Sequence, residues 1–290
     1  MQSLLNKLVL GTAQLGLDYG INNKSGKPSK QKALKTLEFA YKNRIKVFDT
    51  GHDYGTAEEI LGEFCQRHNL YKKIKIITKV RGNISEQLNQ SLARLKMEYV
   101  EGCLLHEPKD LRNEKNIESL KKIKSLGLAK NIGVSVYEPK DAVCAVKSKG
   151  IDYIQVPYNI FDQRLNKTEF FELAKKNRKK VFARSAFLQG LLLMPQEKIP
   201  EHLKEVKAHL IKLDKIIAKY GFFRKQVALL FALENENIDY VVLGVDSVEQ
   251  LKENIDFACQ NINFQDCFKE LKENFSNVER SIISPNLWEK

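Results

Sequence analysis

Four residues in the first part of the chain combine an acid, a phenol, a cation and an imidazole. Asp49, Tyr54, Lys79 and His106 each lie at the end of, or just after, a short apolar segment typical of a buried strand. In a parallel α/β barrel the carboxyl ends of the strands form one rim, where catalytic groups are placed. We expect the Lys79 ammonium to lower the pKa of Tyr54, which makes Tyr54 a candidate proton donor. A lysine at such a rim needs a carboxylate partner, and Asp49 is the candidate.

Each of these residues also has a simpler structural explanation. An aspartate at a strand end often caps a turn, and a tyrosine after a strand often only packs. A lysine there can be a solvated charge, and His106, which precedes Glu107 and Pro108, can be a turn residue. The combination favours a catalytic site, because a barrel would bring three strand ends to one rim.

The elements that would position these residues alternate along the chain. Eight short apolar segments, each followed by residues of helical periodicity, predict eight strand–helix units. The predicted strands cover residues 8–10, 47–49, 74–78, 100–105, 129–134, 153–156, 181–183 and 240–243. The predicted helices include 57–64, 169–177, 201–220, 224–234 and one that begins at Ser247. No linker interrupts the pattern, so we predict one α/β domain over residues 1–290, a (β/α)8 TIM barrel with a C-terminal extension after about Phe264.

Composition agrees with one barrel. The chain has 290 residues, of which 43% are hydrophobic and 29% charged, which suits a globular domain and argues against disorder. No apolar run approaches the ~20 residues that span a bilayer, and the N-terminus is typical of a first strand rather than an export signal. We therefore expect a cytoplasmic protein without a membrane partner.

The cysteine spacing and the charge distribution argue against a metal-binding protein and a nucleic-acid-binding protein. The five cysteines form no C-x-x-C pair, so we expect reduced thiols packed in a core and no metal site. The net charge is +12, and the densest basic cluster, residues 175–180, lies at a helix end before a strand. Without a nucleic-acid motif, solvated helix surfaces are favoured over nucleic-acid binding. A positive field would still attract an anionic cofactor or substrate.

Motifs from Leu8 to Asn254 resemble the aldo-keto reductase family. They are GTAQLG from Gly11, FDTGHDYG from Phe48, ITKV around Lys79, LLHEP around His106, IGVSV around Gly133, IQVPYNIFDQR around Gln155, ARSAFLQGLLL around Arg184, and VVLGVDSVEQLKEN. The resemblance implies reduction of an aldehyde or ketone by hydride from NADP(H) or NAD(H). The chain has no G-x-G-x-x-G motif, and the family binds its dinucleotide without a Rossmann domain.

The resemblance also implies roles for the four residues. Tyr54 would donate a proton to the carbonyl oxygen, and Lys79, paired with Asp49, would lower the pKa of Tyr54. His106 would hydrogen-bond and orient the carbonyl group, since the developing oxyanion needs fixed donors.

Cofactor contacts are implied on several strands. Gly11 and Thr12 would border the cofactor, and Gln155 would bind its carboxamide. Ser135 matches a family serine, but Val136 replaces the asparagine that follows it in the family, which weakens one contact. Arg184, followed by Ser185, stands where many members have a tyrosine stacked on the nicotinamide. A guanidinium can stack in the same way, or Arg184 could pair with a rim carboxylate.

The segment after the last strand would bind the rest of the dinucleotide. Gly244 to Ser247 lead into a helix, a common phosphate site in barrels, and Glu253 and Asn254 match the family's adenine-side pair. Asp246 lies near the position where NADP-preferring members often have Ser, Lys or Arg. A carboxylate there would repel a 2′-phosphate and accept a ribose hydroxyl, so the choice between NADPH and NADH stays open.

Substrate choice would depend on loops over the barrel mouth and on the tail. We expect these to be 16–28, 159–168, 187–200 and the segment with Trp288. Their polar and aromatic side chains favour a sugar-like or polyhydroxylated carbonyl compound. The side chains in question are Asp18, Tyr19, Asn22, Asn159, Asp162 and Arg164.

Two other functions remain open. One is a cofactor-binding regulatory subunit of the same fold. The other is a non-redox isomerase or lyase in which Lys79 forms a Schiff base. The sequence has no exposed apolar stripe or coiled-coil heptad, so we expect a monomer whose partner is a small carbonyl substrate.

Overall fold

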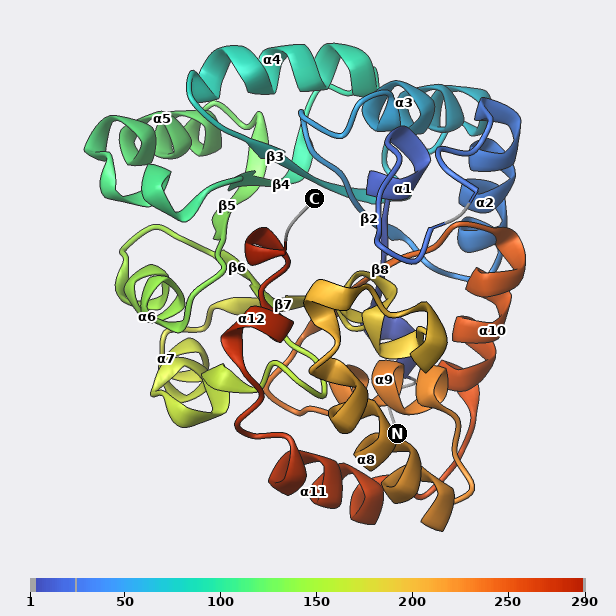
Figure 1. Cartoon of the computed structure of the whole chain (residues 1–290). Helices are drawn as coiled ribbons and strands as arrows, with labels where there is room; N and C mark the ends of the chain where they lie inside the picture. The colour runs from blue at the N-terminus through green and yellow to red at the C-terminus, as the bar shows by residue number, and fades with distance from the viewer. Residues whose placement is uncertain (1–3, 24, 289–290) are drawn as a thin grey trace.

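The computed structural model describes residues 4–23 and 25–288. Within them, eight parallel strands form a closed barrel in the order β1 to β8. The strands are β1 Leu8–Gly11, β2 Val47–Asp49, β3 Lys75–Val80, β4 Val100–Leu105, β5 Ala129–Ser135, β6 Tyr153–Pro157, β7 Lys180–Arg184 and β8 Tyr240–Gly244. Figure 1 shows the strands at the centre and the helices around them.

The helices follow the strands in alternation. They are α1 Ala13–Gly16, α2 Lys30–Lys42, α3 Ala57–His68, α4 Ile84–Leu95, α5 Glu114–Ser125, α6 Pro139–Lys147, α7 Phe170–Lys176, α8 Val206–Lys219, α9 Arg224–Leu233, α10 Val248–Cys259, α11 Gln265–Asn274 and α12 Arg280–Ile283. The predicted (β/α)8 barrel with a C-terminal extension is confirmed. One helix was predicted too long, because a 3-10 turn, Glu201–Leu203, precedes α8 where we expected a continuous helix over 201–220.

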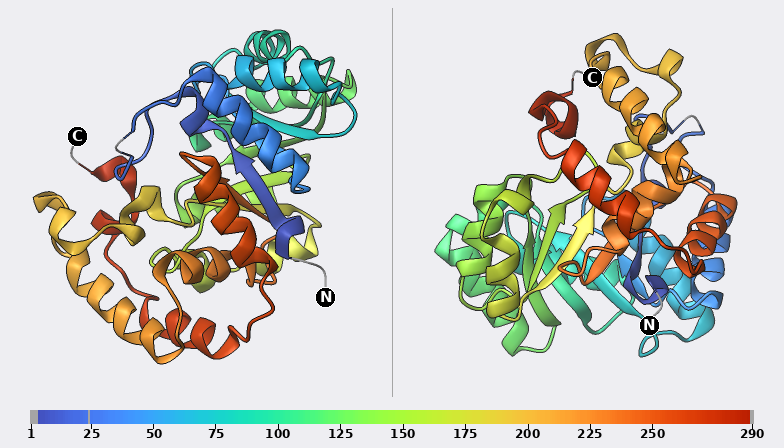
Figure 2. Two further views of the ribbon diagram at one scale, coloured as in Figure 1. Left: turned by 90° about the vertical axis from the view of Figure 1, so that its right-hand side faces the viewer. Right: turned by 90° about the horizontal axis from the view of Figure 1, so that it is seen from below.

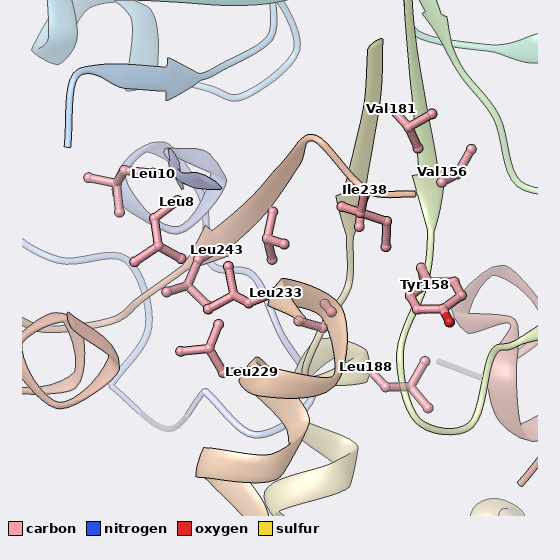
Figure 3. Close-up of a cluster of buried hydrophobic side chains, with 14 of the residues drawn as sticks. Leu8, Leu10, Val156, Tyr158, Val181, Leu188, Leu229, Leu233, Ile238 and Leu243 are labelled. Atoms are coloured by element: carbon pink, nitrogen blue, oxygen red, sulfur yellow. The ribbon is translucent and has the colours of Figure 1, made fainter. Parts of the chain in front are cut away.

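Alternation of side chains along the strands fills two cores. Val9, Ile77, Leu104 and Phe182 pack inside the barrel. The alternate strand residues, such as Leu8 and Leu10, pack outward against the helices in the larger core. Figure 3 shows part of this outer layer, where strand residues meet Leu229 and Leu233 of α9. The barrel interior is therefore a packed core, and a ligand must bind at its mouth.

Two loops lie together over that mouth. The segment between α1 and α2 contacts the segment after β7, where Gln189 Nε2 donates to the Tyr19 hydroxyl at 3.4 Å. A Cβ on Gly190 would lie 2.7 Å from the Asn22 Cβ, so the two loops touch closely. Gly190 also has a φ of +93°, which a residue with a side chain rarely adopts.

The 3-10 helix η1, Leu4–Lys7, and helix α12 lie at opposite ends of the barrel (Figure 2). Cys65, Cys103 and Cys267 are buried as expected, but Cys144 and Cys259 are exposed, because they lie on outward positions of α6 and α10. Among the described residues, no helix combines the length and apolar character needed to cross a bilayer.

Candidate active site

Strand register brings Asp49 and Lys79 together. Asp49 is the last residue of β2 and pairs with Ile77 of β3, so Lys79, two residues further on, points to the same side. Lys79 lies within β3 rather than after it. Its Nζ donates to Asp49 Oδ1 at 2.5 Å and to the Thr50 carbonyl at 3.0 Å. Lys79 is 1% exposed, so the ion pair is shielded from water.

Neighbouring strands fix Asp49 further. Gln155, on β6, donates from Nε2 to Asp49 Oδ2 at 2.8 Å. The Thr12 amide and hydroxyl donate to the Asp49 carbonyl at 2.9 and 3.1 Å. Thr12 is fully buried and does not line the cavity at the mouth. The Thr12 hydroxyl therefore helps to position Asp49, and its expected cofactor contact stays a prediction.

Tyr54 lies on the turn after β2, beside the ion pair. Lys79 Nζ is 5.0 Å from the centroid of the Tyr54 ring. The His106 ring meets it edge to face at 5.7 Å between centroids. The next residue, Gly55, has a φ of +55°, and a Cβ there would collide with the Gly16 carbonyl oxygen. The Tyr-Gly sequence is therefore needed for this turn to approach α1.

The pKa of Tyr54 moves opposite to our expectation. Burial raises it most, and the Asp49 carboxylate raises it further, while Arg184 opposes the rise. Our expectation of a lowered pKa is wrong, because burial and the nearby Asp49 carboxylate outweigh the opposing positive charge. Burial also lowers the pKa of Lys79 itself, against the opposing effect of Asp49. Tyr54 is therefore a protonated phenol at neutral pH.

His106 follows β4 and faces the same site. Its amide donates to the Val80 carbonyl at 2.8 Å, which continues the β3–β4 pairing. Burial, and secondarily the Lys79 charge, lower the pKa of the imidazole. Its Nδ1 lies 3.5 Å from Asp53 Oδ2 without a hydrogen bond. A neutral imidazole carries one N–H, which it can donate to a ligand oxygen.

A cavity of about 330 Å³ opens above this cluster. Of the residues expected to act in catalysis, Asp49, Tyr54 and His106 line it, and Lys79 lies beneath. The expected cofactor residues that line it are Gly11, Ser135, Gln155, Arg184, Ser185, Gly244 and Asn254. Thr12, Ser247 and Glu253 do not line it. Gln14, Tyr137, Gln189 and Lys225 are among the further lining residues that were not singled out from the sequence.

Arg184 lies on the wall formed by β5 and β7. Its guanidinium carbon is 4.5 Å from the centroid of the Tyr137 ring. Nη2 donates to the Val136 carbonyl at 3.1 Å, and Nη1 donates to Ser185 Oγ at 3.3 Å. In the described part of the chain no carboxylate lies within 4.0 Å of it, so the expected alternative, a pair with a rim carboxylate, is not found. Tyr137 could have been suspected because it comes two residues after the end of β5.

The start of α10 forms the opposite end of the cavity. Ser247 caps the helix, since its Oγ accepts from the Gln250 amide at 3.3 Å. Glu253 is half-exposed and pairs with Lys225, which explains why it does not face the cavity. Asn254 is buried, and its Oδ1 has no partner among the described residues. Burial raises the pKa of Asp246, which also lines the cavity.

Only some of the expected substrate loops reach the cavity. Tyr19 and Asn22 of the 16–28 loop line it, as do Phe187 and Leu193 of the 187–200 loop. The 159–168 loop does not, because its polar groups bond within the protein. Asn159 and Asp162 are buried, and Arg164 pairs with Asp162 and Glu138.

No described residue of the tail lines the cavity either. The Trp288 indole donates to the Ser281 and Ile282 carbonyls at 3.0 and 3.2 Å and so folds back on its own segment. Asp18, in the first loop, does not line the cavity either. Of the expected substrate loops, only 16–28 and 187–200 therefore line the cavity in the part of the chain that the structure describes.

Comparison with known proteins agrees with this geometry. The model of the Aldo/keto reductase family matches residues 7–271, and the chain belongs to this family. Members are carbonyl oxidoreductases that use NAD(P)H. The chain is 27% identical to the uncharacterized oxidoreductase YqkF of Bacillus subtilis (strain 168), with 88% of this chain and 91% of that protein covered. It is 23% identical to the L-glyceraldehyde 3-phosphate reductase of Escherichia coli (strain K12), with 97% and 92% covered.

Solved structures have the same fold. An aldo-keto reductase from Bacillus halodurans, in its holo form, superposes with a TM-score of 0.78 at 21% identity and covers 96% of this chain and 95% of its own. The glycerol dehydrogenase of Gluconobacter oxydans gives a TM-score of 0.74 at 20% identity, with 94% of each chain covered.

Proposed function

We propose that this protein is an NAD(P)H-dependent reductase of aldehydes or ketones in which Tyr54 donates the proton. The observation that carries the proposal is the Asp49–Lys79 pair beneath a protonated Tyr54, with a neutral His106 beside it at the floor of the cavity. A reduced nicotinamide supplies hydride to the carbonyl carbon when it is bound. The residues of the chain then supply the proton and the hydrogen bonds to the carbonyl oxygen.

The cavity fits a nicotinamide dinucleotide. It extends from Tyr54 and His106 to the start of α10, past Gly11 and Gly244, which lack side chains. A Cβ on Gly244 would lie 2.3 Å from the amide of Gln14, so the Gln14 side chain would have to move to make room for it. The unpartnered Asn254 Oδ1 is an acceptor for an adenine amino group or a ribose hydroxyl. Ser135 and Gln155 lie nearer the catalytic cluster and would contact the nicotinamide end.

Each catalytic residue has a specific task in this proposal. Tyr54 gives its proton to the oxygen as negative charge develops there. His106 donates its single N–H to the same oxygen and so orients the carbonyl group. Lys79 compensates Asp49, and it also stabilises the tyrosinate that remains after proton transfer. Gln155 and Thr12 keep Asp49 in place for Lys79.

The substrate that this cavity favours is polyhydroxylated. Tyr19, Asn22 and Gln189 lie on the two touching loops and carry polar groups that can hydrogen-bond to hydroxyl groups. A panel of aldoses, keto-sugars and apolar aldehydes tests this, and turnover of apolar aldehydes alone would contradict it.

A Schiff-base mechanism at Lys79 is disfavoured. Its amine is 1% exposed, does not line the cavity and is bonded to Asp49. Borohydride should therefore trap no carbonyl compound on Lys79.

The first test is titration of the purified protein with NADPH and NADH, followed by reduced-nicotinamide fluorescence. We expect saturable binding of at least one, and turnover of carbonyl compounds with it. Binding without turnover of any carbonyl compound would favour a regulatory subunit, and binding of neither would contradict the proposal.

A further inference from the structure

Arg184 is fixed in position at the cavity wall. Its guanidinium lies on the Tyr137 ring and donates to the Val136 carbonyl and to Ser185 Oγ. These partners come from the ends of β5 and β7, so the charge is anchored from two strands. Ser185 itself has a φ of +63°, which turns the chain sharply after Arg184. The cation therefore cannot move away from the cavity without loss of these contacts.

The charge of Arg184 is not compensated locally. Asp49 is neutralised by Lys79, and Lys225 by Glu253. The lowered pKa of His106 keeps that ring uncharged at neutral pH. Asp246 lies at the start of α10, where it contacts Gln250. Among the described residues, Arg184 donates hydrogen bonds only to the Val136 carbonyl and to Ser185 Oγ, and both acceptors are uncharged.

This charge reaches the reacting groups. It lowers the pKa of Tyr54 and also that of Lys79, so its field extends to the floor of the cavity. In the proposed reaction, hydride goes to the carbon and the Tyr54 proton to the oxygen of one carbonyl group. The nicotinamide ring must then lie within a few ångströms of Tyr54, and hence within the same field.

The two redox states of the cofactor differ in charge at this ring. The reduced nicotinamide is neutral, and the oxidised nicotinamide carries one positive charge. We propose that Arg184 makes the site select the reduced form of its cofactor, because its uncompensated guanidinium repels the oxidised ring. This inference rests on the proposed function and adds a specificity-determining residue to it. It also implies weak inhibition by the oxidised product, which suits an enzyme that works toward reduction.

The test is the ratio of two dissociation constants, oxidised over reduced, for whichever dinucleotide binds better. Both are measured by calorimetry on wild type, Arg184→Gln and Arg184→Lys. The phosphates and adenosine are common to both redox forms, so their contribution cancels in the ratio. Arg184→Gln should lower the ratio roughly tenfold or more, as expected for two unit charges within several ångströms in a partly shielded site. Arg184→Lys keeps the charge without the planar stack and should retain most of the ratio.

Lys225→Gln is the matched control. It removes a cation that lines the same cavity but is paired with Glu253. Both dissociation constants should change together, and the ratio should stay within about twofold. If Arg184→Gln binds both forms with the wild-type ratio, the inference is wrong and the proposed function stands. If Arg184→Gln and Arg184→Lys lower the ratio equally, stacking rather than charge is responsible, which also overturns it. If wild type binds neither form, both proposals fail.

Discussion

The catalytic floor and the loop roof of the cavity are built in different ways. The floor consists of Asp49, Tyr54, Lys79 and His106. Its Asp49–Lys79 pair is buried on neighbouring strands, and Asp49 is bound by Lys79 and by Gln155 through hydrogen bonds of 2.5 and 2.8 Å. The roof consists of the 17–29 and 185–194 loops, which meet through one long hydrogen bond and a close approach at Gly190. The floor is specified by strand register, whereas the roof is specified by contacts between loops far apart in the sequence. A change in the floor should therefore affect chemistry and stability, and a change at the roof or rim should affect selectivity.

The largest expected effect is at Tyr54. Tyr54→Phe removes the only hydroxyl that we assign as proton donor, so kcat for carbonyl reduction should fall about 10³-fold. Cofactor dissociation constants should change less than about threefold, because the ring and its contact with His106 remain. Steady-state kinetics and fluorescence titration measure the two quantities. Retention of activity within tenfold of wild type would disprove the assignment.

The next effect tests how strongly the floor depends on its ion pair. Lys79→Met leaves the Asp49 carboxylate buried without its cation, which should cost about 3–5 kcal/mol of unfolding free energy. Urea denaturation measures it.

The double variant Asp49→Asn/Lys79→Met is the control for that loss. It removes both charges and should recover most of the stability while activity stays low. Equal stability of Lys79→Met and wild type would mean that the pair contributes nothing.

Alanine substitution at two glycines distinguishes the cost of backbone strain from the cost of a steric clash. Gly55 and Gly82 have φ values of +55° and +66°, but only a Cβ on Gly55 would collide with other atoms. Gly55→Ala should cost at least about 2 kcal/mol and displace Tyr54, with a loss of kcat. Gly82→Ala should cost about 1 kcal/mol and leave kcat unchanged. Thermal melts measure the loss of stability in both variants, and steady-state kinetics measure kcat. Equal losses in Gly55→Ala and Gly82→Ala would show that the close approach of Gly55 to Gly16 is unimportant.

The smallest expected effect is on cofactor choice at the rim. Asp246→Asn removes a carboxylate that lines the cavity and should improve NADPH binding relative to NADH about tenfold. Glu249→Gln removes an exposed carboxylate from the same helix turn that does not line the cavity, and it should leave the preference within twofold. Competitive titration of the two cofactors gives the ratios. An unchanged ratio in Asp246→Asn would place the 2′-phosphate away from Asp246.

The floor was more predictable from sequence than the roof, for a physical reason. Residues at strand ends keep their order around a closed barrel, so the Asp49–Lys79 contact follows once the strands are recognised. The direction of the Tyr54 pKa was not predictable, because it depends on the burial of the ring and on the charge of Asp49 beside it. The 159–168 loop looked like a substrate loop by composition. In the structure, Asp162 and Arg164 bond to each other and to Glu138 instead.

The sequence by itself determined the barrel and its family, and it pointed to the four residues that we propose for catalysis, because hydrophobic periodicity and short motifs are local properties of the chain. Tertiary structure decided the rest. It turned Thr12 into a support for Asp49 and brought Tyr137 beneath the Arg184 guanidinium, and no described carboxylate pairs with Arg184. It also brought Gln189 to Tyr19 across the cavity mouth. Each of these contacts joins segments far apart in sequence or depends on the direction of a side chain, which local patterns do not encode.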